Sequence, residues 1–123
     1  MRIEEVVSFI NQSVPFRLYA NEFPNEAKND CGYVRFNDGQ PPDIYIVGFK
    51  TPSIQIVIRH ERGDEAERIA KDIWNLFHAK EHYEIGSTKV FLSYCDQSEP
   101  IYVGKDKNGR TIYSINITCK VRD

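Results

Sequence analysis

The sequence predicts an α+β fold, with a mainly antiparallel β-sheet that leaves room for mixed pairing and two α-helices packed on one of its faces. Three observations support this prediction. An alternating strand leads into an amphipathic helix within residues 53–77, a short amphipathic helix stands near the amino end, and alternating segments follow residue 87. The expected order is α-β-β-α-β-β-β, in one domain over residues 1–123.

The stretch 53–77 is the centre of this prediction. Ile54, Ile56 and Ile58 alternate with other residues, which is the period of a strand with a buried face. Asp64 occupies an expected N-cap position and Glu67 follows three residues later, so a capping box is predicted at the start of the helix. The apolar stripe of that helix is Ala66, Ile69, Ala70, Ile73, Trp74 and Phe77.

The remaining elements follow from spacing and turn signals. Apolar residues at helical spacing predict a first helix over residues 3–10, which ends before Pro15 because the residue before a proline avoids helical angles. The dipeptide Asn108-Gly109 predicts a tight hairpin turn between the last two strands. The other predicted strands are residues 31–36, 88–95, 101–105 and 111–121. Loops are expected at residues 21–30 and 78–84, and the short stretch 16–20 is compatible with an extended chain.

Residues 43–52 are rich in β-forming side chains, yet prolines bracket them and Gly48 interrupts them. Proline is tolerated chiefly at sheet edges, so the segment is expected to be an edge strand or an ordered arm. An aromatic arm that does not pack on its own core is a candidate for contact with a neighbouring subunit.

Composition narrows the class of protein. The 123 residues are 41% hydrophobic and 28% charged, which is typical of a globular chain, and the net charge of −2 does not favour direct binding to nucleic acid. The amino end has no signal-peptide pattern, so cytoplasmic synthesis without export is expected. Cys31, Cys95 and Cys119 include no CxxC pair and are expected to be reduced, with Cys95 and Cys119 as small buried hydrophobic residues.

No catalytic motif stands out, and neither a cofactor nor a metal is predicted. The chain has no GxSxG elbow and no glycine-rich phosphate loop. His78 and His82 have the spacing of two metal ligands if the helix continues through them, but no HExxH pattern accompanies them. The acidic residues at the start of the second helix are explained by capping and by the helix dipole.

A resemblance rests on ordered segments of the chain. Residues 52–59, followed by residues 64–70, resemble the strand-to-helix core of siphophage tail terminator proteins, a family often labelled minor capsid protein. Residues 100–106, the turn through Gly109-Arg110 and residues 113–117 are similar to the closing hairpin of that family. The likeness covers about residues 30 to 121 in the same order.

This resemblance implies a structural protein of a phage or prophage and no enzyme. The subunit is expected to form a homohexameric ring on the head-proximal end of the tail tube, to end tube polymerisation and to join the tail to the head. Its implied partners are further copies of itself, the tail tube protein and a head connector or head-completion protein. DNA would pass through the lumen without sequence-specific binding, and no membrane is involved. The ring would assemble in the host cytoplasm and remain at the head–tail junction of the virion.

A ring closes through heterologous contacts, in which one surface of each subunit meets a different surface of the next. Aromatic and arginine side chains are favoured at interfaces, so an aromatic arm is expected to meet charged partners. The residues predicted for this contact are Tyr45, Phe49, Lys50, Arg59, Arg62, Asp106 and Arg110. A near-neutral to acidic subunit suits a lumen that must not hold phosphates tightly.

Two alternatives stay open. One is a different binding module, such as another phage neck component or a small cytoplasmic adaptor or inhibitor. The other is a small hydrolase or metal-dependent enzyme built around His78, His82 and neighbouring acidic residues.

Overall fold

The computed structural model describes residues 1–123 and contains two helices and one eight-stranded sheet. The helices are α1 (Ile3–Asn11) and α2 (Gly63–Phe77). The strands are β1 (Leu18–Ala20), β2 (Cys31–Phe36), β3 (Phe49–Lys50), β4 (Ser53–His60), β5 (Lys80–Ile85), β6 (Thr88–Cys95), β7 (Ile101–Lys105) and β8 (Thr111–Arg122).

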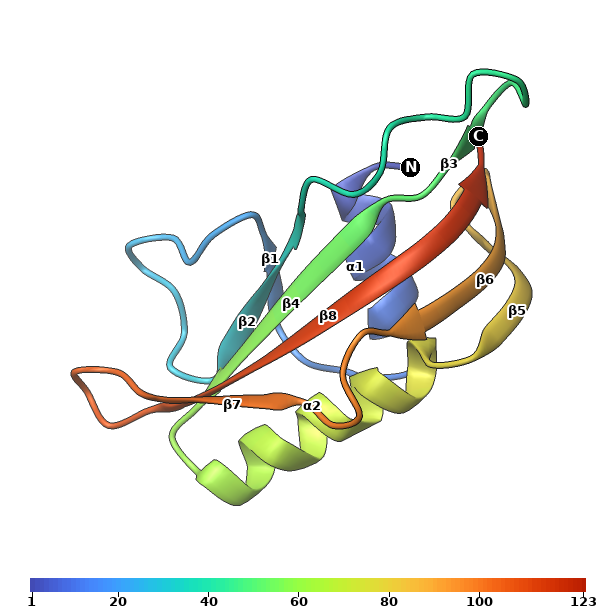
Figure 1. Cartoon of the computed structure of the whole chain (residues 1–123). Coiled ribbons are helices and arrows are strands. Elements are labelled where there is room, and N and C mark those ends of the chain that lie inside the picture. Colours follow the sequence, from blue (N-terminus) through green and yellow to red (C-terminus); the bar gives the residue numbers. More distant parts are fainter.

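Strand β8 is the longest strand and organises the sheet (Figure 1). Its first part pairs with β4 on one side and β7 on the other, and its last part pairs with β3 and β6. The main path through the sheet is β1-β2-β4-β8-β6-β5. Every strand pair is antiparallel except β1 with β2, so the predicted mainly antiparallel α+β fold is confirmed and the pairing is mixed.

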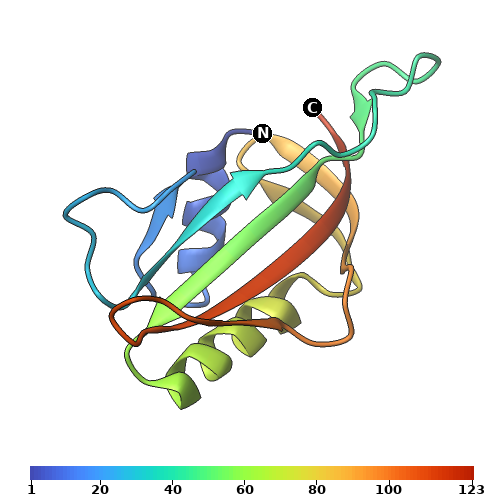
Figure 2. The same cartoon turned by 60° about the vertical axis from the view of Figure 1, so that its left-hand side comes forward.

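Both helices lie on the same side of the sheet (Figure 2). Ile56 of β4 lies opposite Ile115 of β8, and both are buried on the helix side. Helix α1 adds Val6 and Ile10 to this core, while α2 adds a stripe that ends at Phe77. The buried isoleucines of β4 follow the alternation read from the sequence, because a strand turns every second side chain toward the same face.

Most predicted elements are confirmed. The strands at 31–36, 88–95 and 101–105 have the predicted bounds, and the last strand runs one residue further, to Arg122. Strands β7 and β8 form the predicted hairpin. The stretch 16–20 contributes β1, and residues 21–30 contain neither helix nor strand.

The predicted capping box of α2 is wrong. The helix begins at Gly63 with Arg62 as the N-cap, so Asp64 lies inside the first turn and Arg62 Nη2 donates to its carboxylate at 2.9 Å. The turn before the helix is held by one distant and one local contact, since the Glu61 amide donates to Asp30 and the Arg62 amide to His60 Nδ1 two residues before it. These two contacts hold the entry to the helix, which starts without a side-chain cap.

The predicted loop at 78–84 is also wrong, because most of it belongs to β5. This edge strand pairs with β6 from Lys80 to Ile85 and is mostly polar and exposed. Tyr83 packs against the core and Ile85 is buried, so the strand does alternate, but only weakly. Charged side chains are common on edge strands, where they prevent further strand pairing, and they hid this strand from the sequence pattern.

Neither helix is long and apolar enough to cross a membrane.

Candidate functional site

The sheet face opposite the helices carries a shallow apolar groove, which we call the open-face groove. Its volume is about 430 Å³. The side chains that line it come from the 21–30 loop and from β2, β4, β7 and β8: Phe23, Tyr33, Gln55, Val57, Ile101, Val103, Ile112, Ser114 and Asn116. Ile101 and Val103 on β7 are exposed at its edge. No helix of the chain covers this face, so the groove is open to a partner.

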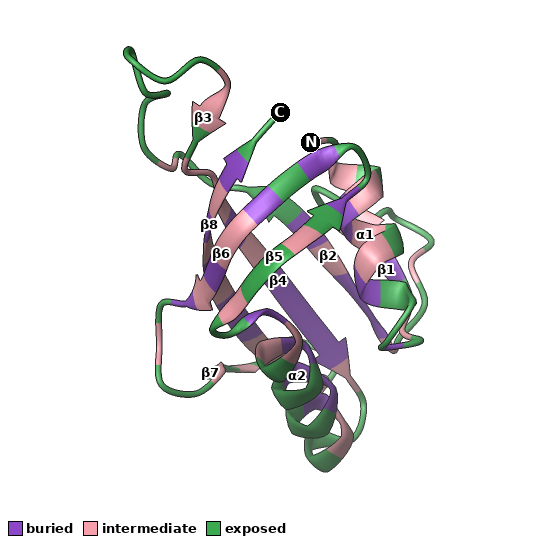
Figure 3. Cartoon of the chain, turned by 90° about the vertical axis from the view of Figure 1, so that its right-hand side faces the viewer, coloured by how far each residue is buried: buried purple, intermediate pink, exposed green.

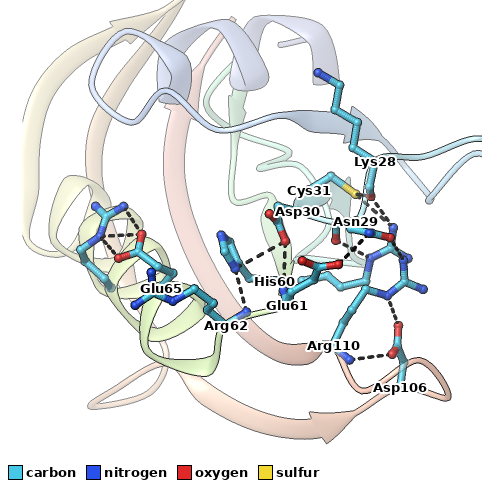
Figure 4. Close-up of polar contacts among 12 residues, drawn as sticks. Lys28, Asn29, Asp30, Cys31, His60, Glu61, Arg62, Glu65, Asp106 and Arg110 are labelled. Atoms are coloured by element: carbon cyan, nitrogen blue, oxygen red, sulfur yellow. Dashed lines mark hydrogen bonds and ion pairs between the residues drawn. The ribbon is translucent and has the colours of Figure 1, made fainter.

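Arg59 on β4 is buried at one end of this face, beneath the 21–30 loop. Its side chain is only 7% exposed, and its guanidinium lies 4.0 Å from the ring centre of Phe23. Nη2 donates to the Lys28 carbonyl at 2.7 Å and to Cys31 Sγ at 3.3 Å, and Nε donates to the Asn29 carbonyl. Figure 4 shows Lys28, Asn29 and Cys31, whose atoms accept these hydrogen bonds. Arg59 therefore fastens the 21–30 loop to the sheet.

A second apolar surface lies at the other end of β8. Residues 44–47, which we call the 44–47 loop, are four consecutive apolar side chains at the tip of the projection before β3 (Figure 1). Ile44 is 85% exposed, Tyr45 88% and Val47 84%. Figure 3 shows the exposed projection standing away from the rest of the sheet. Such a cluster of exposed apolar side chains is typical of a surface that is covered in an assembly.

The 44–47 loop is shaped by polar contacts at its base. Asp43 Oδ1 accepts hydrogen bonds from the amides of Tyr45 and Ile46, at 2.7 and 2.8 Å. The Asp123 amide donates to the Gly48 carbonyl. Gly48 has φ +80°, and a Cβ there would approach the Asp123 carbonyl oxygen at 3.1 Å, so glycine suits this turn. The loop is therefore a defined projection.

The predicted contact residues at this end differ in their availability. Tyr45 is free to meet a partner, whereas Phe49 on β3 is half-buried and its ring stacks on Phe91 with centroids 6.0 Å apart. Lys50 Nζ donates to Asp123 Oδ2 at 2.8 Å, and this ion pair closes the base of the projection. Phe49 and Lys50 thus act as supports of the arm that carries Tyr45.

The other predicted contact residues gather at the opposite end of β8. Arg110 pairs with Asp106 at 2.8 Å inside the β7–β8 turn and donates to Asn29 Oδ1 at 3.2 Å. Its neighbour Asp106 has a pKa below the ordinary value, mainly because it accepts a hydrogen bond from the Arg110 amide. Arg62 is exposed nearby at the start of α2. The structure therefore divides the predicted interface into two groups, one at each end of β8.

The histidines do not form the pair that a metal site requires. Helix α2 ends at Phe77, so the helical spacing assumed for His78 and His82 does not hold. His78 Nδ1 accepts a hydrogen bond from the Cys95 amide, and its ring stacks on Trp74 with centroids 4.3 Å apart. His82 lies on β5. No group of three or more histidine, cysteine or acidic side chains is arranged to hold a metal ion.

The three thiols are free and buried, as expected of Cys95 and Cys119. Burial raises the pKa of both of these thiols to about 12. Burial also raises the pKa of Cys31, but the neighbouring Arg59 guanidinium opposes that shift. None of them lies at a surface where it could act as a nucleophile.

Sequence reasoning found one of the two apolar surfaces in part and missed the other. It proposed the arm within residues 43–52, with Tyr45, as a subunit contact but did not single out Ile44, although four apolar residues stand between Pro42 and Gly48. The groove was harder to find, because Phe23 and Val103 come from separate loops and strands. Only the fold brings these side chains together.

The comparison with known families confirms the resemblance to tail terminator proteins. Residues 7–123 match the family model described as bacteriophage tail terminator protein, which covers nearly the whole chain. No curated protein matches the chain. A phage tail component with a structural role is what this family implies. Because the match extends over far more than half of its length, the chain belongs to the bacteriophage tail terminator family.

Proposed function

We propose that this protein caps the head-proximal end of the tail tube as a homohexameric ring, ends tube polymerisation and provides the surface that joins the tail to the head. The observation that carries this proposal is the 44–47 loop. This chain belongs to the tail terminator family, and its 44–47 loop presents the strongly exposed side chains of Ile44 and Tyr45. Exposed apolar surface of this kind is stabilised when a partner covers it.

The contact between subunits is heterologous. The arm bearing Tyr45, supported by Phe49 and Lys50, lies at one end of β8, and the Asp106–Arg110 turn lies at the other. Two different surfaces at opposite ends of one chain produce a ring when the rotation between copies closes. Arg62 supplies exposed charge beside the turn, while Arg59 acts from beneath by holding the surface in shape.

The ring docks to the tail tube protein on one side and to the head connector or head-completion protein on the other. DNA passes through its lumen without sequence-specific binding, which the net charge of −2 favours over tight phosphate contact. The function requires no catalytic step, cofactor or membrane. Assembly takes place in the cytoplasm of the bacterial host.

The proposal is tested by the tail-length distribution of particles made with the gene disrupted in its phage or prophage. Negative-stain electron microscopy should show overlong, variable tubes without filled heads, and the intact gene should restore one length. A Tyr45→Ala chain should fail to restore it, whereas Glu81→Ala, an exposed change on β5, should succeed. Tails of normal length joined to heads after disruption would overturn the proposal and favour another neck component.

A further inference from the structure

We propose that the 44–47 loop of one copy of this chain inserts into the open-face groove of the next copy. This inference rests on the proposed subunit contact and places the receiving surface in the open-face groove, whose Val103 and Ile112 stand on either side of the Asp106–Arg110 turn. The proposed occupant of the groove is a second copy of the chain, because each copy carries both the exposed apolar 44–47 loop and the uncovered open-face groove.

The loop cannot fill the groove of its own chain. Its base joins β8 at Arg122, where Nε donates to the Val47 carbonyl at 3.2 Å, whereas the groove is lined by Ile112 and Ser114 near the start of that strand. Asn116 is the groove residue of β8 nearest the loop, and six residues of extended chain between Asn116 and Arg122 still span roughly 20 Å. Figures 1 and 2 show the projection pointing away from β7. Its occupant must therefore come from another molecule.

The groove suits an apolar insert. Val57 and Ile112 line it, and Ile101 and Val103 stand exposed along its edge. Its central polar side chain is already satisfied, because Gln55 Nε2 donates to Ser114 Oγ at 3.2 Å. An aliphatic occupant would thus bury apolar surface without breaking this pair.

Charge complements the fit. Arg35 lies on the same sheet face, where its Nε donates to Gln55 Oε1 at 2.7 Å, and it forms no ion pair within the chain. Asp43 at the base of the 44–47 loop accepts two backbone amides and likewise has no cationic partner. In the docked pair, Asp43 of one copy would meet Arg35 of the next. An arginine and a carboxylate at the rim fix the direction of insertion more than they add affinity.

The direct test is disulfide trapping in tailed particles from cells that carry the Val47→Cys, Val103→Cys double variant. Mild oxidation should produce covalent multimers beyond a dimer, because each copy offers one half of the contact at each end. Either single variant should stay monomeric, and the matched Val47→Cys, Glu81→Cys variant should not cross-link. The native thiols remain in all variants since they are buried. Absence of multimers in the double variant, or equal cross-linking by Val47→Cys alone, would overturn the inference.

A second measurement keeps the test independent of cysteine substitutions. Asp43→Asn keeps an acceptor oxygen for the loop amides but removes the charge, and Arg35→Gln removes its partner. Each is expected to lower the fraction of tails with normal length several-fold, and the double variant should be no worse than either single one. Fully additive losses would contradict a direct contact. If gene disruption gives overlong tails but trapping and this cycle both fail, the terminator function stands and the loop-to-groove contact falls.

Discussion

The two faces of the central sheet are built from the same strands but are completed differently. On the helix side, Ile56 and Ile115 are fully covered by α1 and α2. On the other side, Val57 and Ile112 line a groove that this chain leaves open. Neighbouring residues of one strand, such as Ile56 and Val57, therefore have different roles. The first face makes the subunit fold, and the second leaves surface for other molecules.

The comparison also explains the role of the polar residues. At one end of the open face, the 21–30 loop covers the sheet. Arg59 holds this loop in place by donating to its carbonyl groups and by lying over the ring of Phe23. Where the 44–47 loop must remain exposed, Asp43 and Asp123 shape its base without burying its tip. Polar contacts thus set the geometry of apolar surfaces that the core does not reach.

The largest expected effect is on the free energy of unfolding, and it comes from substituting Ile56, which faces the helices; its neighbour Val57, which faces the groove, is the comparison. Ile56→Ala should lower the free energy of unfolding by about 2–5 kcal/mol, because it opens a cavity in the core. Val57→Ala removes two buried methyl groups and should cost only about 1–2 kcal/mol. Urea unfolding of the purified variants measures both.

In assembly, the substitution that costs less stability should cause the larger defect. At a temperature where both variants are folded, Val57→Ala should impair tail-length control more than Ile56→Ala does, since Val57 lines the groove. Equal defects in assembly would show that the open face has no separate role.

The next effect concerns the fastening of the open face. Arg59→Met removes a buried guanidinium that donates to the Lys28 carbonyl, and should destabilise the protein by about 1.5–3 kcal/mol. Limited proteolysis should then cleave within residues 21–30. The control Arg62→Met alters an exposed ion pair and should leave both stability and cleavage unchanged. Wild-type protease resistance in Arg59→Met would show that the loop is held by other contacts.

A smaller effect distinguishes the thiols of the two faces. In the folded protein at pH 8, all three should resist a thiol-labelling reagent, because they are buried and burial raises their pKa. Phe23→Ala should expose Cys31 to labelling first, since Arg59 stabilises its thiolate. Cys95 and Cys119 should stay protected, with pKa values of about 12. Peptide mapping of the labelled chain reports the order, and simultaneous labelling would indicate global opening.

The smallest effect is the pH dependence at the base of the 44–47 loop. The pKa of Asp123 is held far below its ordinary value, first by Lys50, then by Thr88 and by the α-amino group of Met1. Its contribution to stability is therefore fully present above the unfolded pKa of about 3.9 and is lost as the pH falls toward the folded value. The difference in Tm between wild type and Asp123→Asn should be constant near neutrality and shrink below about pH 4. A difference that grows on acidification would contradict this assignment.

The sequence alone identified the elements whose hydrophobic period is strong. The alternation of Ile54, Ile56 and Ile58 and the stripe that ends at Phe77 specify a strand and a helix locally, because each period matches the geometry of one element. The turn at Asn108-Gly109 was equally direct. These local signals were sufficient for the fold class and for the family resemblance.

Tertiary structure alone decided the features that depend on contacts between residues far apart in the sequence. The polar strand β5 is a strand because β6 pairs with it, and Arg59 is buried because the 21–30 loop folds over it. The exposure of Tyr45 and the assembly of the groove around Val57 likewise follow from which surfaces the two helices leave uncovered. A local pattern records whether a side chain is apolar, but only the packed chain determines whether its own residues or a partner must cover it.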